Sequence, residues 1–305
     1  VCIDRRHGLI RRQRVTHTRL STHLDNLVWL WAWATRLTGH TETAVRVVPD
    51  LERRIRYFGE KLYGHTVDPE TLNRAWWLRR NCPFAIRNAG ADGNLSPLRY
   101  LAPDLAESAR IKNEDAWRYY RDRMWPEKDK ATGPGSPRDK RVRLHYPDGG
   151  TPGPAAPEAP DGLWDVVALP ELAFCHALQD HLITEYSNRG IVLEACPSSN
   201  VSIQRLAGYT EHPVLRWHPP DPRALEPGAS CNPYGLRQGP ARVCLNTDDP
   251  GIFPTNIVTE HHHMKAAARE AFALCERDAD RWMDDLRQEG LRAFHETHRG
   301  VRDIP

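Results

Sequence analysis

A short apolar run that ends in two adjacent aspartates constrains the fold of this chain more than any other feature. Residues 243–245 are apolar, two polar residues follow them, and Asp248 and Asp249 then precede Pro250. Because proline cannot donate to a β-ladder, the apolar run is predicted to be a strand that ends where the carboxylates begin. The loops that follow the strands of a parallel α/β barrel converge on one open face, where catalytic groups lie. The pattern therefore favours Asp248 and Asp249 as catalytic residues.

The same residues also have the composition of a tight turn. Asn and Asp side chains bond to their own backbone, and proline fixes φ, so residues 246–250 could form a turn without any chemical role. A turn needs at most one carboxylate, however, and two adjacent carboxylates repel each other unless a cation or a substrate donor lies between them. The pair favours a site, and a turn alone is the alternative.

Composition restricts the chain to the globular proteins. It has 305 residues, of which 40% are hydrophobic and 27% charged, which is enough for one large domain or two ordinary ones. No run approaches the length of about 18 apolar residues that a transmembrane helix needs, and no signal peptide is recognisable. The seven cysteines are scattered without a Cys-x-x-Cys pair, which favours a reducing compartment and excludes a zinc ribbon. We therefore expect a cytoplasmic protein without membrane contact.

Positive charge is concentrated in residues 1–80, although the formal net charge of the chain is only +2. A polyanion could bind such a region, but a solvated helical surface is the commoner cause of a basic excess. Nucleic acid is therefore not the expected partner. Steeply salt-dependent binding would identify the nucleic-acid alternative.

Residues 1–125 are predicted to be mainly helical. Apolar residues recur at helical spacing in four stretches, which begin at Thr22, 49, Asp68 and 105. Thr22 and Asp25 have the spacing of a capping box, and Asp68 before a proline is typical of a helix start. Residues 1–20 lack a clear period and are expected to be a loop or a frayed helix.

The remainder of the chain has a linker and then an α/β pattern. Residues 126–162 are rich in Pro and Gly and almost devoid of apolar side chains, which predicts a disordered linker. Residues 163–305 predict a helix over about 169–188, strands over 191–196 and 243–245, and a helix from Thr259 that runs as far as about Phe294. Such an order is typical of a parallel α/β fold.

The two predicted strand ends carry a recognisable resemblance. They read Glu-Ala-Cys-Pro-Ser-Ser-Asn over 194–200 and Leu-Asn-Thr-Asp-Asp-Pro-Gly-Ile-Phe over 245–253, with His212-Pro213 between them and Thr259-Glu260 after them. Over about residues 165–270 the chain resembles the adenosine/AMP deaminase family of metal-dependent hydrolases. Residues 23–29 resemble, more weakly, a helical insertion of large bacterial members, including those used in antiviral defence.

The resemblance implies a fold, a reaction and two residue roles. The fold would be the C-terminal portion of a (β/α)8 TIM-type barrel, preceded by the mainly helical insertion. Asp248 would be the metal ligand that binds a single zinc ion, and Asp249 would bind the substrate by accepting a hydrogen bond at the purine edge. Zinc lowers the pKa of its bound water to about 7, which gives a hydroxide that converts adenosine, or a related purine nucleoside or nucleotide, to its inosine form plus ammonia.

The chain departs from the family in its histidines. The family takes a His-x-His metal pair from its first barrel strand and further histidines from later strands, and no such pair lies on an apolar strand here. His7, His17 and His23 have unsuitable surroundings, and His261–His263 are typical of a helix surface. One carboxylate does not make a catalytic zinc site, which usually has three protein ligands. Together with a first residue that is Val1, this predicts a fragment that lacks the N-terminal metal-binding histidines and is inactive alone.

A second class of function follows from the same departure. The chain would be a non-catalytic remnant that serves as an assembly or interaction module through its Trp-rich helical half. Its partner would then be the missing part of the barrel or another copy of the chain. Bound zinc with deamination of adenosine would exclude this alternative.

Overall fold

The computed structural model describes residues 15–80, 115–124, 140–146, 163–204, 206–249 and 251–302. These residues form two compact units, of which the first ends at Phe174 and the second begins at Cys175. The described part of the chain is mixed α/β, mostly helical with small sheets. Among the described helices, none combines the length and the apolar character that a bilayer crossing requires.

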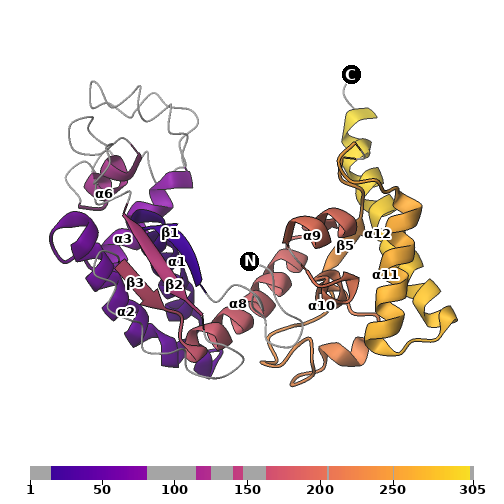
Figure 1. Cartoon of the computed structure of the whole chain (residues 1–305), viewed down its shortest axis with the longest axis horizontal. Coiled ribbons are helices and arrows are strands. Elements are labelled where there is room, and N and C mark those ends of the chain that lie inside the picture. The colour runs from indigo at the N-terminus through magenta and orange to yellow at the C-terminus, as the bar shows by residue number, and fades with distance from the viewer. Residues whose placement is uncertain are drawn as a thin grey trace. The chain divides into compact units, whose positions relative to one another are not determined.

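Helices form the core of the first unit. Its described helices are α1 (Leu20–Leu37), α2 (Glu42–Tyr63), α3 (Pro69–Trp77) and α6 (Asp115–Met124). Helices α1 and α2 pack against each other in the first unit (Figure 1). Their apolar stripes bury Leu24, Leu27, Leu51, Ile55 and Phe58 almost completely. This pairing follows from the helical spacing of their apolar residues, because each stripe must be removed from water.

A three-stranded sheet packs against α1. It consists of β1 (Val15–Arg19), β2 (Arg141–His145) and β3 (Leu163–Val166), with β2 in the centre, antiparallel to β1 and parallel to β3. In β2 the buried side chains Val142 and Leu144 alternate with exposed arginines, which is the period of a half-buried strand. This alternation lies within the range 126–162 that was predicted to be a linker, where the surrounding Pro and Gly residues conceal it. The expectation that residues 1–20 form a loop or a frayed helix is wrong over 15–19, which form the strand β1.

A buried charge network joins the sheet to the helices in the first unit. Arg54 on α2 donates from Nε and Nη2 to Asp165 on β3, at 2.9 and 2.6 Å, and from Nη1 to Glu171 at the start of α8 (Leu169–Asn188). His23 on α1 bonds through Nε2 to the same oxygen of Asp165 at 2.7 Å. Burial alone would raise the pKa of Asp165, but its bonds to His23 and Arg54 hold it below the usual value. Asp165 and Arg54 together thus tie four elements, α1, α2, β3 and α8.

The helix boundaries were predicted with mixed success. The Asp68 cap is confirmed, because its side chain accepts from Thr71 N at 2.8 Å. The Thr22 capping box is wrong, since α1 begins at Leu20 and its N-cap residue makes no side-chain bond. The start at 49 is also wrong, because α2 begins at Glu42 and continues through Pro49. The part of the fourth predicted helix that precedes residue 115 lies outside the described residues.

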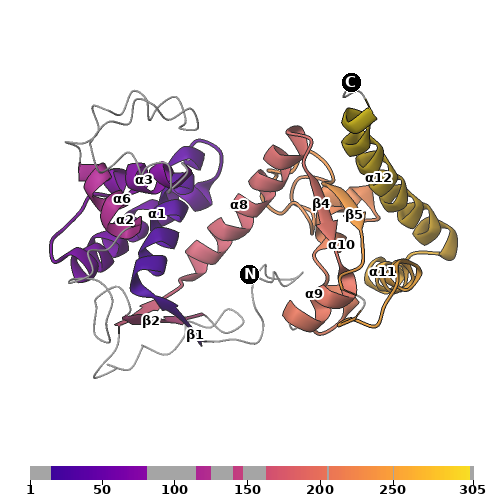
Figure 2. The same ribbon diagram turned by 90° about the horizontal axis from the view of Figure 1, so that it is seen from above.

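The second unit is built around two parallel strands, β4 (Val192–Ala195) and β5 (Arg242–Leu245). Its helices are the later part of α8, α9 (Pro197–Gln204), α10 (Val214–Trp217), α11 (Ile257–Phe272) and α12 (Glu276–Arg302). Val243 packs with Met264 and Ala268 of α11 and with Leu286 of α12 in one apolar core, and Figure 2 shows these two helices beside β5. The parallel pair agrees with the α/β expectation, while closure into a barrel stays a prediction.

The single long helix predicted from Thr259 is two helices. Ala273 adopts a left-handed conformation with φ of 52° and its N–H bonds to Arg269 O, which ends α11. A new helix, α12, begins at Glu276. This helix end is not predictable from the local sequence, because alanine is a good helix former and carries no stop signal.

A second buried charge cluster joins α8 to α10 and to the segment that precedes β5. Asp180 on α8 is fully buried and accepts from Arg216 Nη2 at 2.5 Å. Arg237 lies close by and donates to the carbonyl oxygens of Arg216, Trp217 and Gly239. Burial raises the pKa of Asp180 to about 6, although both arginines oppose the shift. This carboxyl therefore titrates well above the usual range of an aspartate.

The Arg54 network predicts an unequal response of two arginines on α2. Arg54→Met leaves two buried carboxylates without their cation, so we expect it to destabilise the first unit by about 3 kcal/mol. Arg46→Met removes an exposed pair with Glu42 and is expected to cost less than about 1 kcal/mol. Urea unfolding, monitored through the hydrogen exchange of the α2 amides, measures the loss of stability in both variants. Equal losses in the two variants would contradict the network's role.

The raised pKa of Asp180 predicts an unusual dependence of stability on pH. An unfolded aspartate releases its proton near pH 4, so between about pH 4 and 6 the folded second unit binds more protons than the unfolded chain. Its stability should therefore fall by roughly 2 to 3 kcal/mol as pH rises through this window. Asp180→Asn should remove that component, whereas Asp221→Asn at an exposed Arg223 pair should retain it. If urea unfolding shows the same dependence of stability on pH in wild type and in Asp180→Asn, the raised pKa of Asp180 is refuted.

Candidate functional site

The register of the second unit's sheet brings the two strand ends together. Ala195 and Leu245 lie opposite each other at the C-terminal ends of β4 and β5. Asn246 continues the pairing, because its N–H donates to Ala195 O at 2.8 Å and its side-chain amide donates to Glu194 Oε1 at 2.6 Å. The segments that follow the strands, 196–200 and 246–249, therefore begin at the same edge of the sheet.

Asp248 is held from both sides at this edge. Its Oδ2 accepts from Ser199 Oγ at 2.5 Å, and its Oδ1 accepts from Asp249 N at 2.8 Å. The side chain is exposed, and these two bonds, the serine bond first, hold its pKa below the usual value of an aspartate. Asp248 is therefore an ionised carboxylate with a fixed orientation at neutral pH.

Asp249 shapes the loop that follows. Its Oδ1 accepts from Gly251 N at 2.8 Å, and its carbonyl oxygen accepts from Ile252 N and Phe253 N. The bond from Gly251 forms an Asx turn and the two carbonyl bonds close the same loop, so the turn expected as the alternative is present. It uses one carboxylate oxygen of Asp249, and the structure records no bond to Oδ2 of this exposed side chain from the described residues. Turn and site are thus compatible at this position.

Helix α9 supplies the serine that holds Asp248. Pro197 begins the helix, which suits a position whose N–H would have no intrahelical partner. Ser199 is 2% exposed and lies one residue after Ser198, whose N–H donates to the buried Glu260 Oε2 at 3.0 Å. The Ser198 hydroxyl bonds to Tyr209 OH at 3.0 Å. Contacts with other elements therefore fix the first turn of α9.

His212 supports the other side of α9. Its Nδ1 accepts from Val214 N at 3.2 Å, so its Nε2 carries the proton and donates to Asn200 Oδ1 at 3.0 Å. Burial lowers the pKa of His212 to about 4. The ring is therefore neutral at pH 7 and does not carry the second proton that a general acid would give to a substrate. Its role in the described structure is to connect α9 to α10.

The cysteine at the end of β4 is not an activated nucleophile. Burial raises the pKa of the Cys196 thiol, and the negative charges of Glu194, Asp248 and Glu260 raise it further. A thiol must ionise to attack a carbon or to bind a metal, and such surroundings oppose ionisation. The chemistry of this edge therefore depends on oxygen ligands.

The described residues supply one candidate zinc ligand, Asp248, and do not complete a zinc site. Within the described ranges no group of three His, Cys, Asp or Glu side chains is placed to hold a metal ion. His17 lies on β1 and His23 in the buried Asp165 network, both in the first unit, and His263 stacks on Tyr209 with ring centroids 4.4 Å apart. His7 lies outside the described residues.

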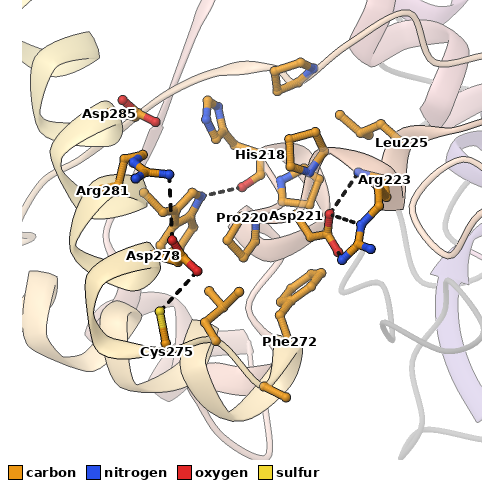
Figure 3. Close-up of a pocket in the computed structure, with 16 residues that line it drawn as sticks. His218, Pro220, Asp221, Arg223, Leu225, Phe272, Cys275, Asp278, Arg281 and Asp285 are labelled. Carbon is orange, nitrogen blue, oxygen red and sulfur yellow. Dashed lines mark hydrogen bonds and ion pairs between the residues drawn. The ribbon is translucent and has the colours of Figure 1, made fainter.

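A cavity of about 630 Å³ lies at the opposite end of β5 (Figure 3). Pro240, which precedes the strand, lines it together with Trp282 and the 218–225 loop. Four of its charged side chains form pairs, Asp221 with Arg223 at 3.0 Å and Asp278 with Arg281 at 3.7 Å, and Asp285 also lines it. Asp248 and Asp249 are not among the residues that line the cavity, so it is separate from them.

Sequence reasoning identified the two aspartates but assigned no role to Ser199 or Glu260. Both residues lie in the segments that carry the family resemblance. A serine that follows a strand and a proline, and a glutamate in the first turn of a helix, are too common to single out. Their importance comes from the register of β4 and β5 and from the packing of α11.

Comparison with known proteins gives a partial likeness. No protein-family model matches the chain. A stretch of 106 residues is 32% identical to an adenine deaminase of Sinorhizobium fredii and covers 34% of this chain and 26% of that protein. Adenine deaminases of Rhizobium meliloti and Mesorhizobium japonicum are each 31% identical, over 86 and 96 residues, with 28% and 32% of this chain covered. The chain thus spans about a quarter of the length of the curated relatives it matches, and over that part it is similar to adenine deaminases.

Proposed function

We propose that Asp248 and Asp249 form the acidic part of a purine site in a deaminase-type hydrolase. The reaction is the replacement of the exocyclic amino group of adenine, or of its nucleoside or nucleotide, by oxygen from water, with release of ammonia. The observation that carries the proposal is the 2.5 Å bond between Ser199 Oγ and Asp248 Oδ2. It joins the two strand ends on which the resemblance rests.

The hydrogen bonds of the two aspartates support different roles. Asp248 is ionised and has both oxygens engaged, which suits a group that holds an ion or a water in a fixed place. Asp249 uses Oδ1 for the turn and can direct Oδ2 to an N–H of a purine. A carboxylate that accepts such a bond recognises the ring edge, because ionised acceptors form the stronger hydrogen bonds.

In this proposal Asp248 is the one described residue that would bind zinc. An aspartate oxygen is a usual zinc ligand, and catalytic zinc sites combine three protein ligands with an open position. The other ligands would have to come from outside the described residues. The name of the relatives favours the free base adenine over adenosine as substrate, so both compounds belong in the test.

An assembly module is the second candidate, and the small sheet of the second unit favours it. The described part of the chain pairs β4 and β5 only with each other, and parallel strands are normally found in larger, covered sheets. Association with another chain through a strand edge would complete the sheet. A monomer by light scattering at high concentration, with purine binding intact, would remove self-association as the explanation.

The purine site predicts a specific loss on changing Asp249. We expect the chain to bind adenine in equilibrium dialysis and Asp249→Asn to weaken binding about tenfold, since hydrogen bonds to charged groups contribute about 1.5–3 kcal/mol. Asp284→Asn is the matched control, because Asp284 is an exposed aspartate of the same unit that pairs with Arg287. Adenosine measured in parallel decides between base and nucleoside.

Two results would overturn this function. Binding of adenine and adenosine that is too weak to detect in the wild-type chain would remove the purine site. Equal affinity of wild type and Asp249→Asn would show that binding occurs elsewhere.

A further inference from the structure

A fully buried carboxylate on α11, Glu260, contacts α9 beside the residue that holds Asp248. Its exposed fraction is 0%, and its Oε2 accepts from Ser198 N at 3.0 Å. Its other oxygen, Oε1, is buried and has no hydrogen-bond partner in the described structure. Burying a carboxylate is costly unless the charge is compensated, so its place at this contact calls for a physical reason.

Two helix N-termini supply that reason. Glu260 lies in the first turn of α11, and Ser198 is the first residue of α9 with a backbone N–H, because Pro197 has none. The first N–H groups of a helix have no intrahelical acceptor, and the helix dipole favours a negative charge near them. Glu260 therefore caps α9 from another element while its charge also lies at the start of its own helix.

The next residue on α9 is the one that touches the candidate site. Ser199 is 2% exposed, and its hydroxyl donates to Asp248 Oδ2 at 2.5 Å. Serine hydroxyls rotate freely, so the direction of this bond depends on where the α9 backbone places the side chain. A shift of the Ser198 backbone moves Ser199 with it.

A second contact from α11 reinforces the first. His263 follows Glu260 by three residues, which places both on one face of the helix. Its ring stacks on Tyr209 with centroids 4.4 Å apart, and Tyr209 OH bonds to the Ser198 hydroxyl at 3.0 Å. One face of α11 thus fixes Ser198 through its backbone N–H and through its side chain.

We propose that Glu260 is a positioning residue, which holds the first turn of α9 so that Ser199 fixes the carboxylate of Asp248. The contacts form a closed ring, because the loop after Asp248 leads directly into α11, and α11 returns through α9 to Asp248. That Asp248 takes part in purine chemistry rests on the proposed function, whereas its orientation by Glu260 does not.

The test uses the 305-residue chain and a spectroscopic signature of Asp248. The ¹³Cγ chemical shift of Asp248 at pH 7 reports its hydrogen bonding, and Ser199→Ala defines the change when the serine bond is lost. Glu260→Ala should move this shift in the same direction by at least half as much. Glu260→Gln, which keeps an acceptor oxygen for Ser198 N, should fall between wild type and Glu260→Ala. The amides of residues 198–200 should exchange at least tenfold faster in Glu260→Ala.

Glu211→Ala is the matched control. Glu211 also accepts a backbone N–H bond, from Ala207 at 2.7 Å, but that bond does not involve α9. The Glu211→Ala variant should leave the Asp248 shift unchanged. If Glu260→Ala destabilises the second unit while the Asp248 shift stays at its wild-type value, Glu260 is only structural and the proposal is overturned. If Glu260→Ala does not fold, an unchanged shift in Glu260→Gln overturns it equally.

Adenine binding separates this inference from the proposed function. Weaker adenine binding in both Glu260→Ala and Asp249→Asn supports the two together. A moved Asp248 shift with adenine binding unaffected by Asp249→Asn supports the positioning role and refutes the purine site. If the Asp248 shift is unchanged in Glu260→Ala and adenine binding is lost only in Asp249→Asn, the purine site is supported and the positioning role is refuted.

Discussion

The hydrogen bond from Ser199 to Asp248 is the interaction on which the candidate site depends. It links the segments that follow two adjacent strands, and it does so from a buried serine to an exposed carboxylate. Without it, Asp248 would be an exposed aspartate on a loop with many rotamers. With it, the carboxylate has a fixed orientation, as a group that holds a cation, a water or a polar substrate must have.

The surrounding structure explains how so small a sheet can support this bond. The strand pair β4–β5 contributes only the register that brings 196–200 beside 246–249. The helices provide the rigidity, since α11 and α12 cover β5 with one apolar core and Glu260 joins α11 to α9. The first unit has its own fixed centre in the Arg54–Asp165 network.

Local signals predicted the elements, and tertiary contacts decided what the sequence could not show. Asp68 before Pro69 predicted a cap because that bond is local, and the apolar run before Asp248 predicted a strand for the same reason. The strand β2 was missed because neighbouring Pro and Gly obscure the alternation of its five residues. The end of α11 at Ala273 was missed because alanine gives no stop signal. The two aspartates were identified by their unusual adjacency. Ser199 and Glu260 were not, because their partners lie 49 and 62 residues away.

Mapping of adenine onto the chain tests the central claim most directly. Amide chemical shifts of the second unit, followed by NMR during titration with adenine, should change at 196–200 and 246–252, where the two strand ends meet. Changes confined to the cavity beside His218 and Trp282, or the absence of any change, would contradict a purine site at Asp248 and Asp249.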